Sequence, residues 1–252
     1  MKITIRFLCC LFILNISVLS FSGCSEKGSL IALTVSSLKP YVYKSEKTSG
    51  FSGVDIDISA QIAKDMNHSI SFVETEPSEI IGKIASGEAD FAIAALSCIY
   101  TNDDSVAFSN VYMRSKQVVL TKKDAGISML SDINGRKTGI LSESSALSYL
   151  QKKKKDYPDI ITVSADTVSA MIDSLLNGEV DAVIIDHETA LIFYMENNSL
   201  DILSQELFID EYAVCVKKDN TLLLNNINKT IERLLREGRI QDFQLNHKNI
   251  PN

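Results

Sequence analysis

The chain has 252 residues, of which 45 % are hydrophobic and 23 % are charged, and its formal net charge is -7. This composition is typical of a globular protein that forms one large domain or two lobes. The excess of acidic residues excludes a nucleic-acid partner, because phosphate binding needs clustered cations.

The first segment of the chain has the pattern of a secretion signal. A short basic region precedes an apolar run at residues 7–18, and this run is shorter than the roughly 20 residues that a membrane-spanning helix needs. The letters LSFSGC at residues 19–24 resemble a bacterial lipobox, which implies cleavage before Cys24 and a lipid on it. The alternative is a plain secretory signal with a chance cysteine. We expect a signal peptide over residues 1–23 and a polar tether over residues 24–29.

Cleavage before Cys24 leaves Cys98 and Cys215 as the other cysteines of the mature chain. They have no CxxC spacing, so we expect no metal site and no disulfide framework. Both lie in apolar runs that read as strands, which favours buried free thiols; a bond between them in an oxidising compartment is the alternative. The sequence has no phosphate loop and no hydrolase or metalloprotease motif, and we expect no cofactor.

The hydrophobic pattern predicts alternating strands and helices. A short strand at residues 31–35 precedes a helix at 54–66, in which Ile58, Ile62 and Met66 fall on one stripe. The other expected strands lie at 69–73, 91–96, 118–121, 137–141 and 212–217, and the other expected helices begin at 145, 187 and 221. The lysines at 152–155 read as a solvated last helical turn that complements the helix dipole.

Two segments of the chain repeat one pattern. Residues 80–95 read IIGKIASGEADFAIAA and residues 171–186 read MIDSLLNGEVDAVIID. In each, an apolar helix ends at a glycine suited to a left-handed cap, and a turn leads into an apolar strand. This order, used twice, predicts an α/β fold in two lobes with mainly parallel central sheets. Ligands bind beyond the carboxyl ends of such strands, here near Ser97 and Asp186.

Several stretches together resemble the periplasmic substrate-binding proteins of the polar amino-acid uptake class, which serve ATP-driven importers. The resemblance covers residues 30–247 and rests on GVDIDISAQIAKDM (53–66), SGEADFAIAALS (86–97), AFSNVY (107–112), GRKTGILSESSALSYL (135–150), LLNGEVDAVIIDHETA (175–190) and the segment 212–243. It implies the type II periplasmic binding protein fold, in which two crossing strands join two α/β lobes. Lobe one would comprise 28–114 plus 213–248 and lobe two 115–212, with hinges at 113–116 and 211–214.

The resemblance also implies a ligand site between the lobes. Asp186 would take the α-ammonium group of an amino acid, which suits a carboxylate at a strand end; the alternative is that it caps the helix that follows. Ser144 and Ser145, after Glu143 in place of the family's glycine, would bind the α-carboxylate at a helix N-terminus. Ser97 and Tyr41 are two further candidates for ligand contact. The alternative role of Ser97 is a hydrogen bond to the local backbone, and that of Tyr41 is structural packing.

One position departs from the family. An arginine that usually clamps the ligand carboxylate is replaced by Asn102, and the family's aromatic positions fall on Leu38 and Pro77. Three explanations are open: Ser97, Asn102, Ser144 and Ser145 hold the carboxylate alone; another cation among Lys39, Arg114 and Lys116 replaces the arginine; or the ligand lacks a free carboxylate. Asp103, Asp104, Glu143 and Asp186 would suit a cationic ligand, although Asp103 and Asp104 also read as solvent-facing helix-start residues.

The resemblance implies an extracytoplasmic solute-binding lipoprotein, periplasmic, monomeric and lipid-anchored to the membrane. Its partners would be a small amino-acid-like ligand and an ABC permease of the inner membrane. One alternative is a binding lobe used for sensing or for docking a partner. Another is a dehydratase-like enzyme on the same fold, for which His68, His187 and His247 are too scattered to offer a site.

Overall fold

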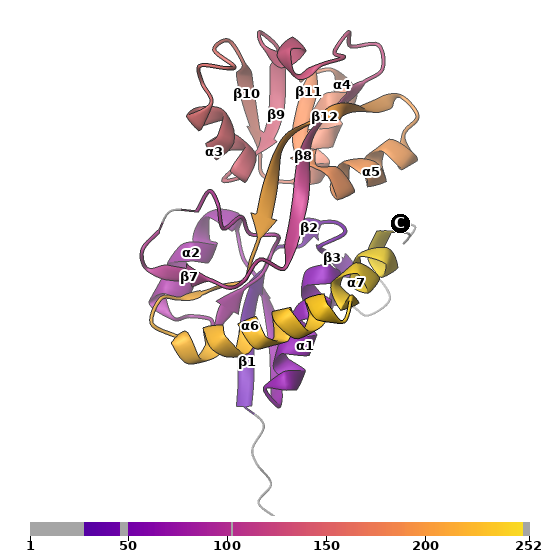
Figure 1. Ribbon diagram of the computed structural model, residues 1–252. Helices are drawn as coiled ribbons and strands as arrows, with labels where there is room; N and C mark the ends of the chain where they lie inside the picture. Colours follow the sequence, from indigo (N-terminus) through magenta and orange to yellow (C-terminus); the bar gives the residue numbers. More distant parts are fainter. Residues whose placement is uncertain (1–27, 46–49, 102, 249–252) are drawn as a thin grey trace, which may run out of the picture.

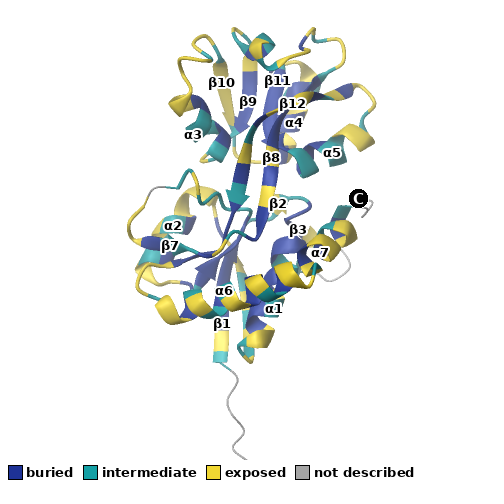
Figure 2. Ribbon diagram, in the orientation of Figure 1, coloured by how far each residue is buried: buried dark blue, intermediate teal, exposed yellow. Residues whose placement is uncertain are grey.

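The structure is a computed structural model that describes residues 28–45, 50–101 and 103–248. Two α/β lobes lie end to end, and the strands β8 (Met113–Lys122) and β12 (Leu200–Tyr212) run between them (Figure 1). Buried residues concentrate in the two central sheets, and exposed ones on the outer helices and loops (Figure 2). The predicted fold class is thereby confirmed.

Lobe one contains a mixed five-stranded sheet in the order β5-β1-β6-β13-β7. Its strands are β1 (Gly28–Thr34), β5 (His68–Glu74), β6 (Phe91–Ala92), β7 (Val106–Phe108) and β13 (Cys215–Lys217). The first three strands of this order are parallel, and β13 pairs antiparallel with β6 and β7. A small second sheet consists of β2 (Ser37–Leu38), β3 (Val42–Ser45) and β4 (Gly50–Ser52).

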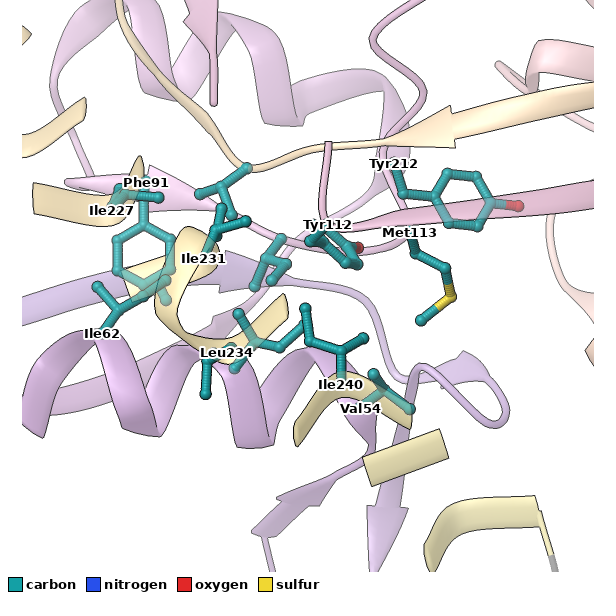
Figure 3. Close-up of a cluster of buried hydrophobic side chains, with 14 of the residues drawn as sticks. Val54, Ile62, Phe91, Tyr112, Met113, Tyr212, Ile227, Ile231, Leu234 and Ile240 are labelled. Atoms are coloured by element: carbon teal, nitrogen blue, oxygen red, sulfur yellow. The ribbon is translucent and has the colours of Figure 1, made fainter. Parts of the chain in front are cut away.

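The helices of lobe one are α1 (Val54–Asp65), α2 (Pro77–Ser86), α6 (Thr221–Arg236) and α7 (Arg239–Lys248). Ile58 and Ile62 of α1 are fully buried, because their spacing of four places them on one helical face. Figure 3 shows Ile62 of α1 and Phe91 of β6 in one cluster with residues of α6, including Ile231. The C-terminal part of the chain thus returns to complete the core of the N-terminal lobe.

Lobe two has a sheet of the same kind, in the order β10-β9-β11-β8-β12. The strands β9 (Lys137–Leu141), β10 (Ile161–Ala165) and β11 (Ala182–Asp186) are parallel, and β8 pairs antiparallel with both β11 and β12. The surrounding helices are η1 (Leu130–Ile133), α3 (Ser145–Lys152), α4 (Val168–Asn177) and α5 (His187–Glu196). Separate apolar clusters cover the two faces of this sheet.

The sequence repeat corresponds to a structural repeat. The helices α2 and α4 end at Gly87 and Gly178, which have left-handed φ values of 83° and 77°. The aspartate that follows plays the same part in each lobe: Asp90 accepts a hydrogen bond from the Ile31 amide at 2.7 Å, and Asp181 accepts one from the Lys137 amide at 2.9 Å. Each aspartate therefore ties the helix–strand turn to the neighbouring parallel strand.

Some elements differ from the expectation. The apolar run 91–96 forms a strand over Phe91–Ala92 alone, and Ala95, near its end, takes a left-handed φ of 47° that does not fit an extended strand. Tyr212 belongs to β12 rather than to the strand β13 that was expected to begin there. Gly28 and Ser29, expected in the tether, already belong to β1. Both described cysteines are free, with Cys215 buried and Cys98 half-buried.

Candidate functional site

A cavity of about 310 Å³ lies between the two lobes. Lobe one contributes the segment after β1, the start of α2 and the chain that follows β6. Lobe two contributes the ends of β9 and β11 and the first turns of α3 and α4, and β12 contributes Asp210 and Tyr212. The cleft therefore lies beyond the carboxyl ends of the parallel strands, where α/β sheets bind ligands.

Asp186, at the end of β11, is the most connected carboxylate of the cleft. Its Oδ1 accepts hydrogen bonds from the amides of Glu188 (2.9 Å) and Thr189 (3.3 Å) and from the Tyr41 hydroxyl (2.9 Å). Its Oδ2 accepts one from the Tyr212 hydroxyl at 2.8 Å. Asp186 therefore caps the helix α5, which was the alternative role considered for it. Burial raises the pKa of its carboxyl.

The bond from Tyr41 to Asp186 joins the lobes. Tyr41 is fully buried and is not among the residues that line the cavity, so its hydroxyl serves Asp186. A second bond, from the Thr189 hydroxyl to the Lys39 carbonyl at 2.7 Å, connects the same two regions. These two hydrogen bonds connect the lobes directly on this side of the cleft.

Asp210, on the crossing strand β12, is a cleft residue that the sequence reasoning missed. It is 1 % exposed, and its Oδ1 accepts a hydrogen bond from the Ser97 hydroxyl of lobe one at 2.6 Å. The Ser145 hydroxyl of lobe two bonds the same carboxyl. Burial raises the pKa of Asp210, and these hydroxyl bonds lower it. Side chains two residues apart on a strand point to the same face, so Asp210 shares the face of Tyr212. This alternation is the signal in the sequence that could have placed Asp210 in the cleft.

Two non-glycine residues at the strand ends of the cleft have left-handed backbones. They are Ala95 in lobe one, with φ of 47°, and Glu143 in lobe two, with φ of 55°. Residues in this region cost free energy, and such strain is concentrated at functional sites. At Ala95 the strain is offset by Asp55, whose Oδ2 accepts the Ala95 amide at 2.7 Å. The family's glycine at the Glu143 position is consistent with this backbone.

Asp55 supports the cleft from inside lobe one and gives the fold a pH dependence. Burial raises the pKa of its carboxyl to about 7, against smaller lowering effects of the Ala95 amide and the Tyr112 hydroxyl. The folded chain therefore binds a proton here that the unfolded chain releases near its ordinary, lower pKa. The stability that this group contributes is present at acidic pH and is lost as the pH rises through about 7.

Between about pH 5 and about pH 8, the titration of Asp55 should lower the unfolding free energy of the wild-type protein by about 3 kcal/mol. We expect Asp55→Asn to lack this decrease, because the asparagine side chain stays neutral at both pH values. Urea denaturation at both pH values measures this difference. Asp173→Asn, at an exposed position of α4, is the matched control and should keep the wild-type slope. An Asp55→Asn protein with an unchanged slope would contradict the assignment of this titration to Asp55.

The charge of the cavity wall is one-sided. Among the described residues that line it, the carboxylates are Glu74, Glu76, Glu143, Asp166, Asp186 and Asp210, and none of the lining residues is Lys, Arg or His. The cations that were candidates to replace the missing arginine do not line the cavity. Arg114 pairs with Glu211 at 2.8 Å, Lys116 pairs with Glu206 at 2.9 Å, and Lys39 lies over the Tyr43 ring.

The predicted site residues are only partly brought together. Ser97, Ser144, Ser145 and Asp186 line the cavity, as do Leu38 and Pro77. Asn102 and Cys24 lie outside the described residues. Asp103 and Asp104 are exposed in a turn before β7, not at a helix start, and they do not line the cavity.

An aromatic group on one wall was not foreseen. Tyr100 of lobe one lines the cavity and packs edge-on against Phe208 of β12, with ring centroids 5.4 Å apart. Phe208 stacks in turn on Tyr149 of α3 at 4.4 Å. The stack joins the two lobes, and Tyr100, the one of these three rings that lines the cavity, offers an apolar surface that suits a ligand with a hydrocarbon part.

Several other kinds of site find no support in the described part of the chain. Residues 28–45, 50–101 and 103–248 contain no group of three potential metal ligands. No helix within these ranges is both long and apolar enough to cross a membrane. His187, the histidine next to Asp186, contacts Glu188 and does not line the cavity.

Two lobes, two crossing strands and a cavity between strand ends define a two-lobed solute-binding protein. The chain belongs to the bacterial extracellular solute-binding proteins, family 3, whose pattern matches residues 30–248. This confirms the resemblance seen in the sequence.

Individual relatives agree with this assignment. The ABC transporter glutamine-binding protein GlnH of Bacillus subtilis is 24 % identical over 205 residues, which cover 79 % of this chain and 74 % of that protein. The arginine-binding extracellular protein ArtP of the same organism is 24 % identical over 240 residues, 94 % of this chain and 92 % of that protein.

A solved structure matches the whole fold. It is an amino acid ABC transporter substrate-binding protein from Streptococcus pneumoniae bound to L-arginine, with a TM-score of 0.81. It is 21 % identical, and the match covers 89 % of this chain and 95 % of that chain. At this identity the likeness concerns the fold.

Proposed function

We propose that the chain is the extracytoplasmic binding protein of an ABC importer and that it binds an amino acid or a related small ammonium compound between its lobes. The observation that supports this most is the acidic cleft at the strand ends, with Asp186 held in place by groups from both lobes. A fixed and buried carboxylate such as that of Asp186 attracts an ammonium group strongly. The glutamine- and arginine-binding names of the relatives point the same way.

The binding needs no catalysis. A ligand that contacts both lobes stabilises the closed arrangement more than an open one, and this difference drives closure. In this proposal lobe one is 28–114 plus 213–248, lobe two is 115–212, and the hinges lie at 113–116 and 211–214. The protein acts as a monomer that delivers its ligand to a permease, and it is not an enzyme.

The proposed location is the periplasm, since the family is extracellular. We propose that a signal peptide over residues 1–23 is removed and that Cys24 carries the lipid anchor. These residues lie outside the described part of the chain, and the proposal rests on the lipobox-like letters LSFSGC. Mass spectrometry of the mature protein tests it: a diacylglycerol on an N-terminal Cys24 is expected, and an unmodified cysteine would contradict lipidation.

A thermal-shift screen against amino acids, short peptides and polyamines tests the proposed binding. A ligand that binds the folded chain and not the unfolded one adds to the free energy of unfolding, by about 2.7 kcal/mol at a hundredfold excess over Kd. This added stability raises the melting temperature. We expect at least one small ammonium compound to give a saturable shift. A folded protein that responds to no member of the screen would favour the second candidate, a lobe for sensing or for docking a partner.

A further inference from the structure

We propose that the ligand of the cleft is a compact organic cation, an amine or guanidinium compound with a short hydrocarbon chain, that carries no carboxylate group. This inference rests on the proposed function, because it assumes that the cleft binds a small ammonium compound, and it narrows the class of that ligand.

The first argument is the charge of the wall. Six carboxylates line the cavity, and no Lys, Arg or His is among the described lining residues. Lys44 neutralises one of the six, Glu74, through an ion pair of 2.8 Å, and Lys152 contacts the ring of Tyr100 without lining the cavity. The remaining wall is still acidic. A ligand carboxylate would enter a negative field, whereas a ligand cation would be attracted by it.

The second argument is that three serine hydroxyls of the cleft already serve carboxylates of the chain itself. Ser97 and Ser145, from opposite lobes, both bond Asp210. Ser142 donates to Asp166 at 3.1 Å. Asp210 thus accepts hydrogen bonds from two hydroxyl groups that could otherwise donate to an anionic group of the ligand. A ligand carboxylate could gain these bonds only by displacing a buried one.

The third argument concerns the helix N-termini that open into the cleft. Such termini favour anions through their unpaired amides and the helix dipole. The chain supplies its own caps in two of these helices, where Ser144 accepts the Leu147 amide in α3 and Thr167 accepts the Ala170 amide in α4. The helix α2 has no side-chain cap and begins at Pro77, which has no amide hydrogen to offer. Asp186 caps α5 with a full carboxylate. The anion-binding capacity of these helix ends is therefore partly taken before any ligand arrives.

The remaining wall suits a hydrocarbon chain with nitrogen at its ends. Leu38, Pro77 and Tyr100 line the cavity between the carboxylates. Thr75, which is 5 % exposed and also lines the cavity, has a hydroxyl oxygen without a hydrogen-bond partner. This hydroxyl can accept an N–H group of a ligand cation, and it can also donate. A buried polar atom without a partner is costly in a folded protein, and a bound ligand would supply the missing bond.

Calorimetric titration of the purified protein with matched pairs tests the inference. Each pair differs in the carboxylate alone: agmatine against arginine, cadaverine against lysine, and putrescine against ornithine. We expect at least one amine to bind about 100-fold more tightly than its amino acid, since like charges across a contact are strongly unfavourable. The corresponding amino-acid amides, in which the carboxylate is neutralised, should recover most of the affinity.

A substitution at Asp210 tests the residue that carries the argument. Asp210→Asn should weaken binding of the preferred amine by about tenfold or more and reduce its preference over the paired amino acid. Asp173→Asn, on the exposed face of α4, is the control and should change neither value. If Asp210→Asn does not fold, Asp210→Ser serves the same purpose, and cooperative thermal unfolding identifies the folded variants. Equal weakening of both partners of a pair would contradict the charge role of Asp210.

The outcomes separate this inference from the proposed function. Binding of the amines in preference to the amino acids supports both. Equal or tighter binding of the amino acids would overturn the inference and leave the proposed function standing. Binding of no member of either series to a cooperatively folded protein would overturn the inference, and the broader thermal-shift screen would then decide the proposed function.

Discussion

Replacing Asp186 with alanine is expected to abolish solute binding and to lower the free energy of unfolding by about 3 kcal/mol, since four hydrogen-bond donors lose their acceptor. Two of these donors are the buried hydroxyls of Tyr41 and Tyr212. Asp186→Asn keeps an oxygen acceptor for the helix cap but removes the charge, so it should lose binding with a smaller loss of stability. Calorimetry measures the affinity and urea denaturation measures the stability.

The matched control for this prediction is another helix cap, one that lies outside the cavity wall. Asn220 caps α6 through the Leu223 amide at 3.3 Å and does not line the cavity. Asn220→Ala should cost about 1 kcal/mol of stability and leave the affinity unchanged. Wild-type affinity in both Asp186 variants would contradict the ligand role of this residue and leave it with its structural role alone.

Replacing Gly53 with alanine is expected to lower the free energy of unfolding by about 3 kcal/mol or more, because the site has neither the backbone freedom nor the room for a Cβ. Gly53, just before α1, has a φ of 134°. A Cβ there would lie 2.1 Å from the Tyr41 carbonyl oxygen and 2.5 Å from its carbonyl carbon. Relief of this clash would move Tyr41, which donates to Asp186, so the solute affinity should fall as well.

Gly82 provides the matched comparison. It lies inside α2, and a Cβ at this position meets nothing within 4 Å. Gly82→Ala should leave the stability unchanged or raise it by about 0.5–1 kcal/mol, in line with helix propensity. Chemical denaturation of both variants measures the contrast. Equal stabilities of Gly53→Ala and Gly82→Ala would show that the turn before α1 tolerates a side chain.

The repeated helix–strand pattern made the fold predictable because it is local. The apolar spacing, the glycine and the aspartate of each copy lie within 16 residues, from 80 to 95 and from 171 to 186. The structure adds the reason for the aspartate: Asp90 and Asp181 each hold a neighbouring strand. The antiparallel partners of these sheets were less predictable, since β13 and β12 return from distant parts of the chain.

The site was predictable in its position and less so in its chemistry. Strand ends gave Ser97 and Asp186 directly, because the carboxyl ends of parallel strands share one edge of a sheet. Asp210 was missed because it lies on an antiparallel strand that crosses between the lobes, and its bond to Ser97 spans 113 residues of sequence. The burial of Tyr41 against Asp186 is likewise a tertiary contact that no local pattern encodes.

The contacts of the cavity wall bear on why Asn102 stands where the family usually has an arginine. The sequence left three explanations for Asn102: hydroxyl groups alone, a substitute cation, or a ligand without a carboxylate. In the described structure the proposed substitute cations do not line the cavity, and Ser97 and Ser145 are bonded to Asp210. The third explanation is therefore the one that agrees with the largest number of contacts.

A crystal structure of the protein with the tightest ligand from the screen tests the central claim most directly. The account predicts a small ammonium compound in the cavity between the lobes, with its nitrogen atoms within hydrogen-bond distance of Asp186 or Asp210. A ligand bound elsewhere on the molecule, or one whose own carboxylate takes the Ser97 and Ser145 hydroxyls away from Asp210, would contradict it.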